Sequence, residues 1–521
     1  MKLKNITRSA VVMLAVLVGA QSCLEKYPGD ALLEKDSMKS ITDAEQHLYG
    51  IYAYYKSSAL FSGYLTYLPD VQADLVYAVD GFTNIHGDIW QWNIRTTNPE
   101  IEDVYAALNT IIGQCNYFLE KVGPLRASLV DDAEIEHLDS WTGEVYCARA
   151  MAYSELIKCF CKAYPLTADA SDPAAVGDDA KAANELGVVL RQTYSGHETA
   201  RRASLKDSWD LVLSDLEKAE AMISEDDDAY NNVWFSRAAA HALHARAALY
   251  MGHWDDAVKH ASEVIDSGVF RLADATATYT TDANGNPVNY YDYMWQYDSS
   301  FEVIWKVGFT QTSYGGALGA IFLNLNVDYV NYYPDYVPAT WAVNLYGSGD
   351  LRASAFFADV TTGYPHGLSW PLLVKYMGNR NLMANRIYHV NMPKVLRLSE
   401  LYLIRAEALC HQRKFGEAQA DLLTLRQKRY SSGGNVSVSE KDWLKVISDE
   451  RVRELYMEGF RLNDLKRWGK GFERTPQSNS LKQGSSLKIE AGDYRFTWPI
   501  PNHEIESPDT DIEQNPGYAG L

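Results

Sequence analysis

Cysteine is scarce in this chain, and its distribution excludes two common uses of it. Six cysteines occur in 521 residues. An odd number remains once Cys23, near the amino terminus, is set aside, and no CxxC spacing occurs, which argues against a disulfide scaffold and against a zinc site. We expect the other five to be buried as small hydrophobic side chains: Cys115, Cys147, Cys159, Cys161 and Cys410.

Basic residues are also outnumbered. The chain has 48 Lys and Arg against 68 Asp and Glu, which gives a formal net charge of -20 at pH 7. A surface this acidic repels the phosphates of nucleic acids and the head groups of anionic lipids. We therefore expect no nucleic-acid partner.

Apolar runs long enough to span a bilayer, roughly 20 residues, are absent. The run from Ala10 to Ala20 is shorter, and it follows a basic start, which is the layout of a cleaved export signal. The following residues, AQSC, resemble a bacterial lipobox, although Ala20 stands where that pattern prefers Leu. We expect residues 1–22 to be a lipoprotein signal peptide, Cys23 to carry the lipid, and residues 23–40 to be a tether. The alternative is ordinary cleavage without a lipid.

The common catalytic motifs are missing as well: GxSxG, HExxH, the Walker loop and GxGxxG do not occur. His241 and His244 have the spacing of a shared metal site, but no acidic or Cys ligand is near them in sequence, so helix-surface histidines are expected. Residues 282–286 resemble the start of a calcium loop, yet Tyr293 replaces its twelfth-position Glu, which favours a hairpin turn at Asn284-Gly285. We expect a non-catalytic protein with no cofactor and no metal.

Helical periodicity dominates the first half of the chain. It covers residues 41–58, 100–122, 137–164 and 206–223, and a pair of helices across 235–267. Within this pair and again in residues 408–425, an aromatic residue opens the second helix and alanines follow at helical spacing, which resembles tetratricopeptide units. The fold class predicted is mainly α, with such helix pairs forming a scaffold.

Residues 271–390 differ from this scaffold, because they are rich in Gly, Asn, Tyr and Trp and contain short β-like runs such as FEVIWKVGF. We interpret them as a loop-rich, partly β insertion, and loops carried by a rigid scaffold are where recognition commonly takes place. No low-complexity linker separates the parts, so residues 41–521 are expected to form one domain. Its scaffold comprises residues 41–270 and 391–470, and residues 471–521 anchor the chain end.

Aromatic residues next to amides supply the candidate binding site. In residues 80–93 these are Phe82, Asn84, Trp90, Trp92 and Asn93. In an extended segment the two tryptophans would point the same way, and a flat indole packs well on a pyranose while amides take its hydroxyls. The alternative is two core tryptophans on one strand face. Further candidates lie in two tyrosine-rich stretches of the insertion: Trp295, Tyr332 and Tyr333.

Four ordered signatures in the last third of the chain carry a resemblance. They are LRLSELYLIRAEA at 396–408, ERVRELYMEGFRLNDLKRW at 450–468, TWPIP at 497–501 and QNPGY at 514–518. Together with the lipobox, they resemble the SusD/RagB family of outer-membrane nutrient-binding lipoproteins of Bacteroidetes. Most of these residues have a structural explanation, since Glu and Arg three or four apart can pair along a helix that Gly459 bends or ends.

The resemblance implies about four tetratricopeptide-like helix pairs that support a variable, ligand-binding insertion at residues 271–390. It also implies a function and a partner. Such a protein is lipid-anchored at the outer membrane, faces the cell exterior, and covers a SusC-like TonB-dependent transporter. It captures a nutrient, most often an oligosaccharide, and delivers it to that transporter. Three alternatives stay open: a RagB-like protein that binds peptides, a tetratricopeptide scaffold without a small ligand, and a lipid-anchored glycosidase.

Overall fold

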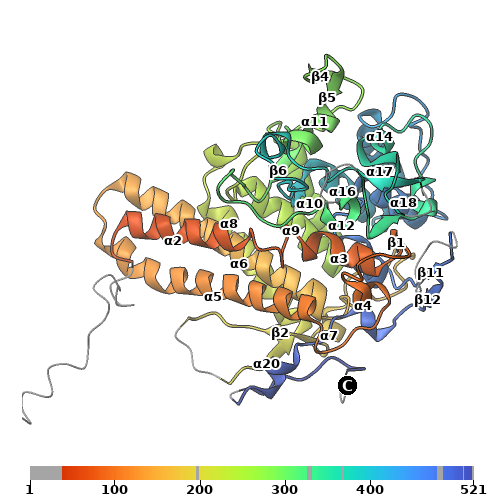
Figure 1. Ribbon diagram of the computed structural model, residues 1–521. Helices are drawn as coiled ribbons and strands as arrows, with labels where there is room; N and C mark the ends of the chain where they lie inside the picture. Colours follow the sequence, from red (N-terminus) through yellow and green to blue (C-terminus); the bar gives the residue numbers. More distant parts are fainter. Residues whose placement is uncertain are drawn as a thin grey trace, which may run out of the picture.

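The structure is a computed structural model that describes residues 38–194, 199–324, 331–364, 369–477, 485–508 and 510–518 (Figure 1). The expected signal peptide, Cys23 and most of the expected tether lie outside the described residues. In the part of the chain that is described, each helix is too short or too polar to cross a bilayer.

Four long helices run side by side at one end of the molecule (Figure 1). They are α2 (Ile41–Tyr54), α5 (Pro99–Ser128), α6 (Asp132–Phe160) and α8 (Leu205–Met222), close to the predicted ranges. α6 packs against the other three, so its second half is almost entirely buried. Ser204 caps α8, whereas α2 is capped by Ser40 with Asp43 completing a capping box.

Two further helix pairs continue the scaffold: α9 (Arg237–Met251) with α10 (Trp254–Asp266), and α16 (Leu398–His411) with α17 (Phe415–Gln427). Gly252 joins the first pair at a φ of +72°, where a Cβ atom would lie 2.6 Å from Leu166. Ala257, Ala261 and Ala418 are fully buried, which lets neighbouring helices approach closely. The predicted mainly α fold of tetratricopeptide-like pairs is confirmed.

The variable insertion is partly β, as predicted. Six two-stranded sheets occur among the described residues, and β6 (Val303–Trp305) joins the insertion to β10 (Leu396–Arg397) before α16. The hairpin of β4 (Thr278–Thr281) and β5 (Pro287–Asn289) projects with α11 (Tyr290–Tyr297) from the top of the view in Figure 1. Other short elements of the insertion are α12 (Ala320–Leu323), α13 (Thr340–Val343), α14 (Arg352–Phe356), β8 (Phe357–Thr361), β9 (Ser369–Leu373) and α15 (Arg380–Met383). Outside the insertion, between α6 and α9, lie α7 (Asp179–Ala182), β2 (Leu186–Val189), β3 (Arg202–Ser204) and η2 (Glu225–Asp227).

The segment between α2 and α5 contains α3 (Tyr64–Gln72), β1 (Val76–Ala78) and α4 (Gly87–Trp90). β1 pairs antiparallel with β7 (Tyr336–Pro338) of the insertion, and Ala78 faces Tyr336. Because the strands are antiparallel, the loop after β1 and the loop before β7 lie at the same end of this sheet.

The carboxyl-terminal part breaks its predicted helix in two, α18 (Trp443–Glu454) and α19 (Arg461–Arg467). Gly459 lies between them at a φ of +83°, where a Cβ atom would be 2.1 Å from the Leu65 carbonyl oxygen. This close approach explains the glycine. The last elements are β11 (Phe472–Arg474), β12 (Leu487–Ile489), η3 (Tyr494–Phe496) and α20 (Asn502–Glu506).

Pairing of Glu and Arg along the helix was predicted. In the structure, the charged side chains of α18 pair mainly with other elements. Glu450 does pair with Arg453 at 2.9 Å, three residues on. The Glu454 carboxylate, however, is buried among guanidinium groups from three other segments: Arg352, Arg397 and Arg429. Burial alone would raise the pKa of Glu454, but these arginines hold it well below its usual range. A buried carboxylate needs several partners at once, and one helix face does not supply them.

Candidate functional site

Three segments that are distant in sequence form one surface at the end of the β1/β7 sheet. Residues 80–86 follow β1, residues 331–336 lead into β7, and residues 362–364 pair with the second segment through a bridge between Tyr332 and Thr362. We call this surface the loop face. It brings together three predicted ligand-binding residues that are at least partly exposed, Asn84, Tyr332 and Tyr333.

Asp335 connects the first two segments of the loop face. Its Oδ1 atom accepts hydrogen bonds from the Thr83 amide at 2.7 Å and from the Thr83 hydroxyl at 2.8 Å. Its carbonyl oxygen accepts from the Val79 amide at 2.9 Å. Burial raises the pKa of the Asp335 carboxyl, and the two bonds from Thr83 oppose that rise.

Two tyrosine rings meet on the loop face. The rings of Tyr333 and Tyr364 lie 5.4 Å apart at an interplanar angle of 70°, and both are partly exposed. The Tyr364 hydroxyl donates to the Pro334 carbonyl oxygen at 2.7 Å. A Cβ atom at Gly363 would lie 2.3 Å from the Tyr333 ring, so glycine is what allows this ring to sit there. Burial raises the pKa of Tyr364 to about 12, so its hydroxyl stays neutral at physiological pH.

The backbone of residues 80–86 is strained. Asn84 and His86 have φ values of +64° and +54°, which non-glycine residues rarely adopt. The His86 ring is held from both sides, by Glu100 Oε1 at 3.0 Å and by the Tyr67 hydroxyl at 3.2 Å. Ile85, which lies between Asn84 and His86 in the sequence, is 40% exposed. Strain of this kind persists where the surrounding structure enforces it, commonly at ligand-binding loops.

The prediction that Trp90 and Trp92 form an exposed stacking platform is wrong. They are 0% and 1% exposed, so the burial expected in the alternative is confirmed, although the two residues do not share a strand face. Trp90 ends the helical turn α4 and lies 4.9 Å from the Arg474 guanidinium, and the Trp92 indole donates to the Gln72 carbonyl oxygen at 2.5 Å. Because the segment coils where an extended strand was assumed, the two rings enter two different core clusters.

Three other predicted residues add nothing to an exposed aromatic surface. Phe82 is buried against the Tyr336 ring, at 5.8 Å between centroids. Trp295 is buried in α11 with the Lys375 ammonium 4.1 Å from its ring centroid, so its faces are not open to a sugar. Asn93 is exposed, but it follows the buried Trp92. The stacking roles expected of Phe82 and Trp295 are therefore wrong.

The structure has a second aromatic surface, whose residues were not among the candidates chosen from the sequence. Tyr279 of β4 is 46% exposed and lies 4.8 Å and 4.4 Å from the rings of Tyr290 and Tyr293, and Tyr293 stacks on Tyr297 at 4.5 Å. We call these four residues the tyrosine strip. The spacing of its three helical members, i, i+3 and i+7, is a signal for one helix face that could have found them. Tyr364 has no such local signal.

Two expectations about polar clusters have opposite outcomes. The Asn284-Gly285 turn is confirmed, since it joins β4 to β5 and Asp282 accepts from the amides of Asn284 and Asn286. The prediction of helix-surface histidines without an acidic neighbour is wrong, because His244 is 5% exposed and bonds Glu220 of α8 at 2.8 Å. The five cysteines are buried and unpaired as predicted.

A scaffold of tetratricopeptide-like helix pairs that presents a surface of anchored loops defines a helical-repeat protein with a loop-rich face. The chain belongs to the SusD family. The family model described as "SusD family" matches residues 366–518, and the one described as "Starch-binding associating with outer membrane" matches residues 33–249.

Two curated relatives are similar in sequence. The starch-binding protein SusD of Bacteroides thetaiotaomicron is 30% identical over 160 residues, which are 31% of this chain and 28% of that protein. The SusD-like protein P38 of Formosa agariphila is 24% identical over 565 aligned positions, 99% of this chain and 100% of that protein.

Solved structures share the fold. A SusD superfamily protein of Bacteroides thetaiotaomicron has a TM-score of 0.74 at 22% identity and covers 92% of this chain and 100% of its own. A protein of Bacteroides vulgatus that is provisionally described as sugar-binding has a TM-score of 0.72 at 24% identity, and the match covers 92% of this chain and 99% of its own. A laminarin-binding SusD-like protein has a TM-score of 0.64 at 20% identity, and the match covers 92% of this chain and 100% of its own.

Proposed function

We propose that this protein binds an oligosaccharide at its loop face, without catalysing a reaction on it. The observation that carries the proposal is the geometry of that face, where the Tyr333 and Tyr364 rings lie beside a strained loop whose tip presents Asn84 and Ile85. Aromatic faces pack against the CH face of a pyranose, and amide and hydroxyl groups bond its hydroxyls. The relatives described as starch-binding and laminarin-binding support the same ligand class.

Three acidic residues around this region have structural roles. Asp70 is fully buried and accepts from the amides of Gly459 and Arg461, while Asp74 pairs with the Arg461 guanidinium at 2.8 Å. Asp335 is occupied by Thr83. These carboxylates have structural partners, which favours binding over hydrolysis.

The proposal extends to location and partner. Cys23 carries the lipid, residues 23–40 tether the domain, and residues 41–521 act as one unit outside the cell at the outer membrane. There the protein passes its ligand to a SusC-like TonB-dependent transporter. The description "associating with outer membrane" of the matched family model and the lipobox support this part. A peptide ligand and a scaffold without a small ligand are the alternatives.

A binding screen tests the proposal. The purified protein is passed through affinity gels that contain soluble polysaccharides and is titrated with peptide pools in a calorimeter. Retardation by one glycan class, with no release of shorter products, is the expected result. A response to peptides alone would replace the glycan by a peptide, shorter products would indicate a glycosidase, and silence from both ligand classes would favour the scaffold.

A further inference from the structure

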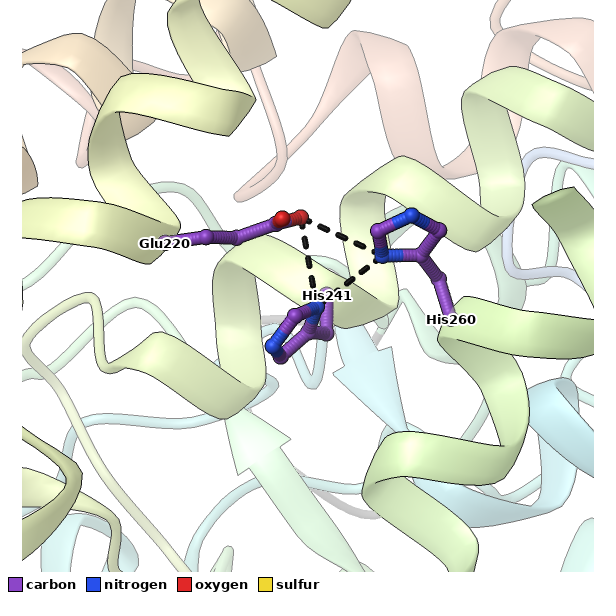
Figure 2. A group of neighbouring side chains, drawn as sticks. All are labelled: Glu220, His241 and His260. Carbon is purple, nitrogen blue, oxygen red and sulfur yellow. Dashed lines mark hydrogen bonds and ion pairs between the residues drawn. The ribbon is translucent and has the colours of Figure 1, made fainter.

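Three helices of the scaffold bring metal-ligating side chains to one point (Figure 2). Glu220 lies in the last turn of α8, His241 near the start of α9, and His260 in α10. Figure 2 shows the carboxylate and the two imidazoles pointing toward one another. The three ligand atoms lie within 4.8 Å of one another, although up to 40 residues separate them in the sequence.

Hydrogen bonds among these three side chains do not explain the arrangement well. The Nδ1 atoms of His241 and His260 are 2.9 Å apart, and they lie 3.2 Å and 3.3 Å from the same Oε1 atom of Glu220. If both nitrogens carry hydrogen, the two N–H groups crowd each other. If only one does, the lone pair of the other faces a carboxylate oxygen, since a neutral imidazole has one donor and one acceptor nitrogen.

A cation at the centre of the triangle removes this conflict, because both lone pairs and the carboxylate then face a positive charge. Zinc binds imidazole nitrogen and carboxylate oxygen at about 2.0–2.2 Å in a tetrahedron, which places ligand atoms roughly 3.3 Å apart. The observed separations of 2.9 to 3.3 Å are close to that value. The donor set of two imidazoles and one carboxylate also suits zinc better than calcium or magnesium.

A second histidine of α9 supports the carboxylate. His244 Nδ1 lies 2.8 Å from Glu220 Oε1, and its ring stacks on the His260 ring at 3.6 Å between centroids. A group that hydrogen-bonds a ligating carboxylate fixes its orientation and tunes the site. The side chains of Glu220 and His241 remain partly exposed, which leaves a path for the ion.

We propose that Glu220, His241 and His260 bind one Zn²⁺ ion, with His244 positioning the carboxylate and a water molecule completing the tetrahedron. The ion clamps α8, α9 and α10 together. The site is separate from the loop face, so the inference does not depend on the proposed ligand.

Zinc titration of the tag-free full chain tests the proposal. The protein, purified in detergent and stripped with a chelator, is titrated with Zn²⁺ by calorimetry, and its thermal unfolding is followed with and without the ion. We expect one equivalent to bind and to raise the unfolding temperature. His241→Gln and His260→Gln are expected to weaken binding about 100-fold or more, and His244→Gln about 10-fold, as for the partner of a ligand.

His137→Gln is the matched control, because His137 is an exposed histidine on α6. It is expected to bind zinc as the unmodified chain does. Stoichiometric binding that survives His241→Gln, or that His137→Gln weakens equally, would overturn the proposal. Should a variant fail to fold, X-ray absorption at the zinc edge of the unmodified chain decides, since a spectrum without imidazole scattering contradicts the site.

Discussion

Thr83 and Asp335, 252 residues apart, are joined by two hydrogen bonds to one carboxylate oxygen, at 2.7 and 2.8 Å. The first residue belongs to the loop after β1 and the second to the variable insertion. One buried carboxylate therefore sets how the two halves of the loop face lie relative to each other. The shape of the proposed binding surface depends on that contact.

Replacing this carboxylate should disturb both folding and binding. Asp335→Ala removes the acceptor of both Thr83 donors, and hydrogen bonds to charged groups contribute about 1.5–3 kcal/mol each. We expect a loss of unfolding free energy of that order and a roughly tenfold weaker glycan affinity, measured by denaturant unfolding and calorimetry. Asp282→Ala is the control, because it likewise removes a carboxylate that accepts a backbone hydrogen bond, in the turn of the β4/β5 hairpin. It should leave the affinity unchanged.

The rings on the loop face should carry the stacking energy. Tyr333→Ala and Tyr364→Ala are each expected to weaken glycan binding by about 1–3 kcal/mol, the range found for bases stacked on aromatic side chains. Tyr293→Ala in the tyrosine strip is the matched control in the same calorimetric titration. A loss at Tyr293 with none at Tyr333 or Tyr364 would move the site to the strip.

Trp90 should behave as a core residue. Because its side chain is fully buried, Trp90→Ala is expected to cost about 3–5 kcal/mol of unfolding free energy through the cavity that it leaves. Trp234→Ala removes a ring of the same size that is 40% exposed, and it should cost far less. Chemical denaturation of both variants measures the difference, and equal costs would speak against the packing described for Trp90.

Glu144 should make stability depend on pH. Burial raises the pKa of this carboxyl to about 8, although a hydrogen bond from the Tyr52 hydroxyl lowers it in part. A raised folded-state pKa means that this stabilising contribution is full below the unfolded value of 4.5 and is lost as the pH rises toward 8. Glu144→Gln should therefore gain on the unmodified protein by roughly 1.4 kcal/mol per pH unit between pH 5 and 8.

Denaturant unfolding at several pH values measures this gain. Glu136→Gln, at an exposed position of the same helix, serves as the control and should run parallel to the unmodified protein at every pH. A constant offset for Glu144→Gln across that range would contradict the shifted pKa.

The lipid anchor makes its own prediction. Cys23→Ala removes the thiol that would receive the lipid, and several acyl chains are needed for lasting attachment to a membrane. We expect the variant to leave the membrane fraction while it still binds the glycan, as seen by cell fractionation and affinity gel. Retention in the membrane would show that another part of the chain holds it there.

Elements that depend on local pattern could be predicted from the sequence. The helix ranges and the hairpin turn at Asn284-Gly285 follow from signals within a few residues. The buried cysteines follow from their apolar surroundings. These features were accessible because helix periodicity and turn chemistry are short-range properties.

The candidate site was only partly accessible in this way. Asn84, Tyr332 and Tyr333 were identified by residue type, whereas Trp90, Trp92, Phe82 and Trp295 have the same composition around them and are buried. An aromatic residue serves a core as well as a sugar site, so its type does not decide its exposure. Tyr364 had no signal at all, because its neighbour Tyr333 is 31 residues away.

The sequence by itself determined the helix pairs, the hairpin turn at Asn284-Gly285 and, through its ordered signatures, the family. Only the tertiary structure decided which aromatic rings face solvent, that Asp335 holds Thr83, and that Glu220 and His260 meet His241. The physical reason is distance along the chain. Local signals fix each element, but a site made of side chains from separate elements exists only once those elements pack.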